Sequence, residues 1–277
     1  MTEWLRTRKD RPCPVCGKPD WCSVAADGTA AHCMRIASDR PLASGGWIHR
    51  LAESTPPVPL RPRRRERRKR LSVKRTFLPW FSATTPAARA ALADRLGITV
   101  RSLNRLPCVW ASPYEAWAFP MFDGARRPIG IRLRSDTRKW AVTGSRNGLF
   151  WPLGLMGKAA GPLIVCEGPT DTAALLDLGF DTLGRPSCSG GAEYVRLACR
   201  HLHRRDVVIV ADADRPGRDG AEALARMLVC DSRSVRVIQP VHPHKDVRAW
   251  VRAGASRPAV ECVIAQQRYR KAGKETP

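Results

Sequence analysis

The sequence has no apolar run near the roughly 20 residues that span a bilayer, and its first residues, MTEWLRTRKDRPCPVC, lack a secretory apolar core. These absences favour a cytoplasmic protein without a membrane partner. The chain also has no internal repeat and no GxxxxGKS or GxxxxGKT segment, which excludes a P-loop motor within it.

Acidic residues are scarce, with 25 Asp and Glu against 48 Lys and Arg and a formal net charge of +23. Such an excess of positive charge favours polyanionic partners, nucleic acid before an anionic membrane surface. At 277 residues the chain can bury a real core, so we expect one or two domains with smaller parts.

Composition divides the chain into five segments. We expect a cysteine-rich domain over 1–52, a basic Pro/Arg-rich linker over 53–76, a basic subdomain over 77–160, an α/β domain over 161–258, and a C-terminal helix and tail over 259–277. The linker contains the run RPRRRERRKR, which is either a strap that binds phosphates or a solvated connection. The basic residues singled out there are Arg64, Arg65, Arg67 and Arg68.

Four cysteines crowd into the first segment with the spacing Cys13-x2-Cys16-x5-Cys22-x10-Cys33. A CxxC turn lets two thiolates reach one tetrahedral ion, and a structural zinc site needs four such ligands. The alternative is a set of free thiols, but about 50 residues would hardly fold without metal or docking.

The second half of this pattern is incomplete, because Ile36 stands where a second CxxC would place its last cysteine. Cys22 can complete the ligand set, with His32 or His49 as the alternatives. The sequence leaves this choice open.

Residues 77–160 mix helix and strand patterns. PAARAALADRLGI predicts a helix that ends at Gly97, and the apolar arms around Asp123-Gly124 predict a β-hairpin. The second arm alternates apolar residues with Arg132 and Arg134, so one face would be buried while the other presents guanidinium groups.

Four cations of this region suit the phosphate oxygens of a nucleotide or template. They are Arg132, Arg134, Lys139 and Arg146. Trp140 and Trp151 would either stack on bases or pack in the core.

From residue 161 the segments PLIVCEG, VVIVADAD and SVRVIQP read as short buried strands separated by helices. This alternation predicts a parallel sheet with right-handed crossovers. We expect the last dozen residues, QQRYRKAGKETP, to be a frayed tail.

Acidic side chains follow these strands. Glu167 ends the first strand, Asp212 and Asp214 end a later one and would point the same way, Asp171 begins a helix, and Asp246 follows the third strand. All five would meet at one sheet edge, where like charges are costly without Mg²⁺ or a similar hard cation. For Asp171 and Asp246, helix capping is the alternative.

The segments VCEGPTDTAALL and VVIVADADRPGRDGAEALA resemble the Toprim domain of primases, topoisomerases and some nucleases, over about residues 161–255. The resemblance implies that Glu167 is a metal-linked or acid-base carboxylate and that Asp212 and Asp214 are the main metal ligands. Asp171 and Asp246 match further acids of the primase branch. The expected fold is α/β, with a Toprim-type parallel sheet flanked by helices, after a small α+β basic subdomain and an N-terminal zinc ribbon.

The cysteine segment resembles the zinc ribbon of bacterial and phage primases, and the order of the segments matches that branch. The resemblance implies a DNA primase, a nucleotidyltransferase that makes short RNA primers for DNA replication on single-stranded DNA, and a compact primase without a motor favours a mobile element as its origin. It would use ribonucleoside triphosphates, structural zinc and catalytic Mg²⁺ or Mn²⁺, with a separate replicative helicase as partner. A Toprim nuclease and a non-catalytic nucleic-acid-binding scaffold are the alternatives.

Overall fold

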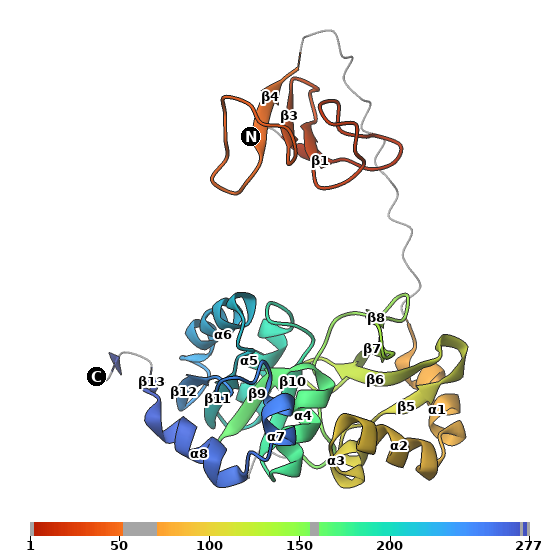
Figure 1. Ribbon diagram of the computed structural model, residues 1–277, viewed down its shortest axis with the longest axis vertical. Helices are drawn as coiled ribbons and strands as arrows, with labels where there is room; N and C mark the ends of the chain where they lie inside the picture. The colour runs from red at the N-terminus through yellow and green to blue at the C-terminus, as the bar shows by residue number, and fades with distance from the viewer. Residues whose placement is uncertain (1–2, 52–70, 156–160, 272–273, 276–277) are drawn as a thin grey trace. The chain divides into compact units, whose positions relative to one another are not determined.

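The computed structural model describes residues 3–51, 71–155, 161–271 and 274–275. The chain forms two compact units, Met1–Glu66 and Arg67–Pro277 (Figure 1). None of the described helices is long and apolar enough to cross a membrane. The linker arginines Arg64, Arg65, Arg67 and Arg68 lie outside the described residues.

The first unit is a small antiparallel sheet with the strand order β1-β2-β3-β4. Its strands are β1 (Trp4–Arg6), β2 (Ser23–Ala25), β3 (Ala30–Cys33) and β4 (Trp47–Arg50). Its buried cluster centres on Cys13, Cys22 and Cys33. Because cysteines take the place of larger apolar side chains, this unit has little apolar core of its own.

The second unit begins with three helices, α1 (Val73–Ala83), α2 (Pro86–Leu96) and α3 (Val100–Arg105). Helix α2 starts where the Thr85 hydroxyl accepts a hydrogen bond from the Ala88 N–H (3.1 Å). It ends at Gly97, whose φ of 66° is the left-handed conformation that glycine tolerates, and this confirms the predicted end of the helix.

A second antiparallel sheet follows, with the order β5-β6-β7-β8. Its elements are β5 (Val109–Ala111), a 3₁₀ turn over Ser112–Tyr114, β6 (Ala116–Phe122), β7 (Pro128–Arg134) and β8 (Lys139–Ala141).

The predicted hairpin forms between β6 and β7, but its turn is not a two-residue Asp-Gly turn. The Asp123 carboxylate accepts hydrogen bonds from the N–H groups of Ala125 (3.0 Å) and Arg127 (2.9 Å), which closes a longer loop. The left-handed residue is Arg126, with φ 61°. Gly124 is needed for a different reason, because a Cβ there would lie 2.4 Å from the Leu197 Cβ of a packed helix.

The remainder is the predicted mostly parallel sheet, with the order β10-β9-β11-β12-β13-β14. Its strands are β9 (Leu163–Glu167), β10 (Asp181–Arg185), β11 (Asp206–Val210), β12 (Ser234–Ile238), β13 (Arg270–Lys271) and β14 (Lys274–Glu275). Its helices are α4 (Gly168–Asp177), α5 (Ala192–His201), α6 (Arg215–Leu228), α7 (Val247–Arg252) and α8 (Arg257–Gln266).

Both faces of this sheet are covered by helices (Figure 1). Leu163 and Val165 of β9 pack in the cluster that contains α5 and α6, whereas Ile164 and Cys166 pack in the cluster with α4, α7 and α8. This alternation is the period-two pattern of a strand buried on both faces.

Two predictions about this sheet were incomplete. Strand β10 was missed, because its sequence DTLGR has charged ends and an internal glycine rather than an apolar run. The expected frayed tail contains β13, which pairs with β12 through Val235 and Arg270 and extends the edge of the sheet.

Candidate functional site

The acidic residues lie around the carboxyl edge of the parallel strands, as expected. Glu167 is the last residue of β9. Strand β11 ends at Val210, so Asp212 and Asp214 follow it in a loop and do not alternate on the strand itself. That loop is fixed by two backbone hydrogen bonds, from Ala211 N–H to the Ile238 carbonyl (2.9 Å) and from Ala213 N–H to the Lys245 carbonyl (2.7 Å).

Asp214 caps helix α6. Its Oδ1 accepts a hydrogen bond from the Gly217 N–H (2.8 Å), and its Oδ2 lies 3.7 Å from the Lys245 Nζ. A cation therefore lies beside the acidic pair Asp212 and Asp214. It is Lys245, which directly precedes Asp246 and was not among the predicted site residues.

Asp171 and Asp246 both bond the start of helix α7. Asp246 caps it, accepting from the Ala249 N–H (2.7 Å), and Asp171 accepts from the Arg248 N–H (3.1 Å). The capping alternative is thus correct for Asp246, whereas Asp171 bonds a neighbouring helix rather than its own. Each uses Oδ1 for this contact, and the Asp171 Oδ2 also accepts a hydrogen bond from the Thr170 hydroxyl (3.4 Å).

The carboxylates influence one another's ionisation. Burial first, and then Asp212, raise the pKa of Glu167 to about 7, while Arg185 opposes the shift. Burial and then Asp246 raise the pKa of Asp171 to about 7. Burial, Asp246 and Asp214 raise the pKa of Asp212, and the positive charges of Lys245 and Lys139 oppose this. The site therefore favours either protons or cations among its carboxylates.

These carboxylates line an open edge rather than a closed cage. Among the described residues, only cysteine sulfurs form a group of three or more ligand atoms within 4.8 Å of one another. Hard carboxylate oxygens at wider spacing fit Mg²⁺ or Mn²⁺, since Mg²⁺ keeps several waters and takes one or two carboxylates with substrate phosphates.

Two of the four predicted phosphate-binding cations reach this edge. The Arg134 Nη1 donates to the Thr170 Oγ1 (3.0 Å), next to Asp171, and Lys139 acts electrostatically on Asp212. Arg132 is half-buried and donates to the Asn147 Oδ1 (3.0 Å), and the Arg146 side chain is exposed in a loop.

Base stacking and core packing were the alternatives for Trp140 and Trp151, and the structure buries both rings at least partly. Trp151 is 3% exposed and belongs to the core, which settles it as a packing residue. The Arg138 guanidinium lies 4.0 Å from the ring centroid of the half-buried Trp140.

Sequence reasoning missed Arg185, whose side chain lies beside Glu167. Arg185 and Glu167 are register partners on the neighbouring strands β10 and β9. The missed strand hid it, and the only local signal in the sequence is an arginine directly before the glycine-containing loop PSCSGG.

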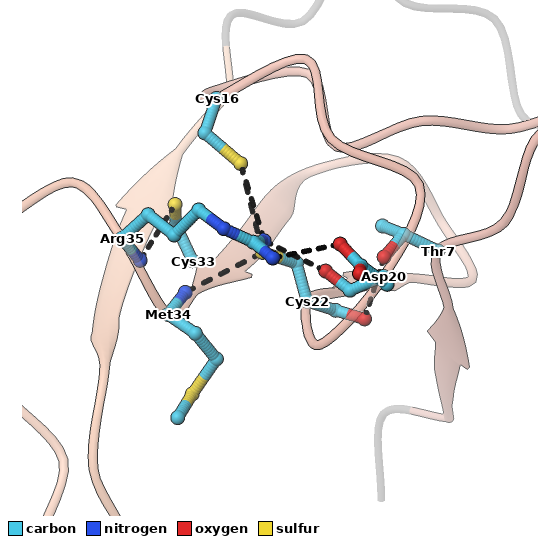
Figure 2. Close-up of polar contacts among 7 residues, drawn as sticks. All are labelled: Thr7, Cys16, Asp20, Cys22, Cys33, Met34 and Arg35. Atoms are coloured by element: carbon cyan, nitrogen blue, oxygen red, sulfur yellow. Dashed lines mark hydrogen bonds and ion pairs between the residues drawn. The ribbon is translucent and has the colours of Figure 1, made fainter.

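In the first unit, the sulfurs of Cys13, Cys16, Cys22 and Cys33 come within 4.8 Å of one another. Figure 2 shows the sulfur of Cys16 directed at that of Cys22, 3.7 Å away. The two alternative ligands have other partners: His32 Nε2 lies 2.8 Å from the Gly45 carbonyl, and His49 Nε2 lies 3.0 Å from the Ile36 carbonyl.

Backbone N–H groups already point at these sulfurs. Met34 donates to the Cys22 Sγ (3.4 Å), and Arg35 and Ile36 donate to the Cys33 Sγ (3.5 and 3.3 Å). The turn after Cys33 thus keeps the N–H donors of a CxxC knuckle although Ile36 replaces its second cysteine. Four thiolates with N–H donors around them fit a structural zinc ion.

Comparisons with known proteins agree with this architecture. A family model described as Toprim-like matches residues 164–249. A search of curated proteins found no match.

Solved primase structures share the fold. The E. coli primase catalytic core is 20% identical, with a TM-score of 0.54 over 69% of this chain and 78% of that one. The Aquifex aeolicus primase, with its zinc-binding and RNA polymerase domains, is 15% identical, with a TM-score of 0.53 over 71% and 60%. A primase catalytic domain solved with single-stranded DNA is 19% identical, with a TM-score of 0.53 over 70% and 79%.

Residues 164–249 therefore form a Toprim-like domain, and the fold that contains it is similar to that of bacterial primase catalytic cores.

Proposed function

We propose that this protein is a primase-like nucleotidyltransferase that makes short RNA primers on a single-stranded DNA template. One observation carries the proposal: carboxylates that follow two strands, β9 and β11, and carboxylates at the starts of helices α4 and α7 gather at one edge of a Toprim-like sheet, near Arg134 and Lys139. In a chain of net charge +23, such a gathering of acids is best explained by divalent cations and nucleotide phosphates.

Divalent ions held by Asp212 and Asp214, with Asp171 and Asp246 beside them, would supply charge stabilisation for the attacking and leaving oxygens, and Glu167 would act as the acid-base carboxylate. Arg134 and Lys139 would bind the triphosphate of the incoming ribonucleotide, with Arg132 and Arg146 on adjoining phosphates. The bond from O3′ to the α-phosphorus forms as pyrophosphate leaves, and Glu167 accepts the proton of the 3′-hydroxyl. Its pKa of about 7 suits a general base at neutral pH.

The four clustered thiolates would hold a structural zinc ion in the first unit, with Cys22 as the fourth ligand. A ribbon of this type would contact the DNA template, and the linker arginines would add salt-dependent phosphate contacts. Single-stranded DNA and ribonucleoside triphosphates are therefore the proposed partners. The likeness to a catalytic domain solved with single-stranded DNA supports the first of these.

Primer synthesis tests this proposal. The full chain is mixed with a mixed-sequence single-stranded template and labelled ribonucleotides, in Mg²⁺ and in Mn²⁺, beside Asp212→Asn and the control Glu261→Gln. Glu261 is an exposed acid on α8 that pairs with Arg257 of the same helix (2.8 Å). We expect short RNAs from the wild type and Glu261→Gln, and a loss of at least about 100-fold for Asp212→Asn, typical of a catalytic electrostatic group.

The alternatives give different results in the same assay. Shortening of labelled DNA without nucleotides would identify a Toprim nuclease instead. Tight DNA binding with neither synthesis nor cleavage would identify a scaffold. Equal primer yield from Asp212→Asn would refute the assignment of the site.

A further inference from the structure

Trp21 is the most exposed large apolar side chain among the described residues, with 77% of its surface accessible. It lies between the first cysteine pair and Cys22 in the zinc-ribbon unit. An indole ring is a large apolar surface that is normally at least partly covered. The high exposure of the Trp21 side chain is therefore unusual for an indole ring.

The backbone at Trp21 is unusual as well. Its φ of 66° is in the left-handed region, which a bulky side chain rarely adopts. Such a conformation persists only where the neighbouring structure holds it in place, and outliers of this kind gather at functional sites.

The residues on either side of Trp21 are indeed held (Figure 2). The Arg35 guanidinium donates to the Asp20 Oδ1 (2.7 Å) and to the Asp20 carbonyl (2.8 Å). The Cys22 carbonyl accepts from both the N–H and the hydroxyl of Thr7 (3.0 Å each), while its sulfur joins the thiol cluster. The ring is thus presented from a fixed turn rather than from a free loop.

Cations adjoin this turn. Arg6 of β1 is the register partner of Ser23, Thr7 bonds Cys22, and the next residue along the chain is Arg8, whose guanidinium pairs with Asp10 (2.8 Å). Arg35 lies on the other side through its contacts with Asp20. An aromatic face between basic residues is the arrangement that binds a single strand, because bases stack on the ring while cations contact the flanking phosphates.

We propose that Trp21 is a nucleobase-stacking site for single-stranded nucleic acid, with Arg6 and Arg8 on the phosphates beside the stacked base. This inference rests on the proposed function for its ligand, and it assigns to the ribbon a specific contact with an unpaired base. Charge complementarity favours nucleic acid over a protein partner on this turn, because residues 6–11, residues 18–20 and Arg35 together hold six basic side chains against two acids, Asp10 and Asp20, which pair with Arg8 and Arg35.

Binding of fluorescent DNA to the full-length zinc-loaded chain tests the proposal. A mixed-sequence 15-nucleotide single strand and the matching blunt duplex are titrated against the wild type, Trp21→Ala, Trp21→Phe and the control Trp4→Ala. Trp4 is 41% exposed on β1 of the same unit. Trp21→Asn is included because asparagine tolerates a left-handed backbone, and zinc content and thermal unfolding verify that each variant folds.

We expect Trp21→Ala and Trp21→Asn to bind the single strand about tenfold more weakly, the lower part of the range for one stacked base. Trp21→Phe keeps most of the affinity, because its ring still stacks. Trp4→Ala keeps all of it, and the duplex binds every variant alike. The slope of affinity against salt does not change, since tryptophan neutralises no phosphate.

Unchanged single-strand affinity of both Trp21→Ala and Trp21→Asn overturns the proposal, as does an equal loss on single strand and duplex. These results are separable from those of the primer assay. Weakened single-strand binding by Trp21→Ala in a protein that makes no primers would leave the stacking site standing while the nucleotidyltransferase proposal fails. Primer synthesis by the wild type together with unaltered single-strand binding by Trp21→Ala would overturn the stacking site and leave the nucleotidyltransferase proposal standing.

Discussion

Arg185 shows how a single buried residue organises the candidate active site. It is only 3% exposed, and its guanidinium donates to the carbonyls of Gly190 (3.1 Å) and Cys188 (2.6 Å). The backbone N–H of Cys188 in turn favours the ionised form of Glu167. Arg185 therefore acts on Glu167 both through its charge and through the loop that it holds.

Replacing Arg185 with methionine removes this charge and both hydrogen bonds. Because Arg185 opposes the upward shift in the pKa of Glu167, we expect that pKa to rise further. The acidic limb of the pH profile for primer synthesis should then move to higher pH, and Arg185→Lys should restore part of it. Loss of these donors to the carbonyls of the half-buried Cys188 and Gly190 should lower the free energy of unfolding by about 1 kcal/mol. Measuring synthesis from pH 6 to pH 9 tests this, and an equal loss of activity at every pH would contradict it.

At the scale of elements, the first unit depends on ligands rather than on packing. Its strands are three or four residues long, and the buried cluster between them consists mainly of cysteines. Strands this short gain little from apolar burial. Structural zinc sites contribute roughly 10–16 kcal/mol of apparent binding free energy in small domains. We therefore expect zinc to account for most of the stability of this unit.

Cys22→Ser should release the zinc and abolish the folded state of the first unit, while the thermal transition of the second unit remains. His32→Ala and His49→Ala are the matched controls and should keep one zinc per chain, because both imidazoles bond backbone carbonyls instead. Atomic absorption and thermal unfolding give the two readouts. Zinc retained by Cys22→Ser but lost from either histidine variant would assign the fourth ligand to a histidine.

At the scale of the whole molecule, the distribution of charge couples stability to pH and to divalent ions. Although the chain carries +23, burial first and neighbouring carboxylates second raise the pKa of Glu167 from 4.5, and of Asp171 from 3.8, to about 7. The folded state therefore holds protons that the unfolded state releases. These groups should make the protein less stable as pH rises from about 4 to about 7.

Mg²⁺ should reverse this loss by pairing with the ionised carboxylates. We expect it to raise the melting temperature more at pH 8 than at pH 6, at constant ionic strength. A free concentration of 100 times Kd would add about 2.7 kcal/mol. Differential scanning fluorimetry of the wild type and Asp212→Asn measures the effect. An equal shift at both pH values, or in both proteins, would rule out a site at these carboxylates.

Local patterns in the sequence determined much of this protein. The helix end at Gly97, the hairpin arms, the alternating strands and helices, and the acids at the strand ends follow from residue periodicity and turn chemistry, which act over a few residues. The CxxC spacing in the same way indicated a metal-binding ribbon.

Tertiary structure decided which distant residues meet. It brought Cys22, rather than His32 or His49, to the other thiols, and it placed Arg185 beside Glu167 through a strand without an apolar pattern. It also buried Trp151 and left Trp21 in solvent. Contacts and burial of this kind depend on how separate elements pack, and no local pattern encodes that packing.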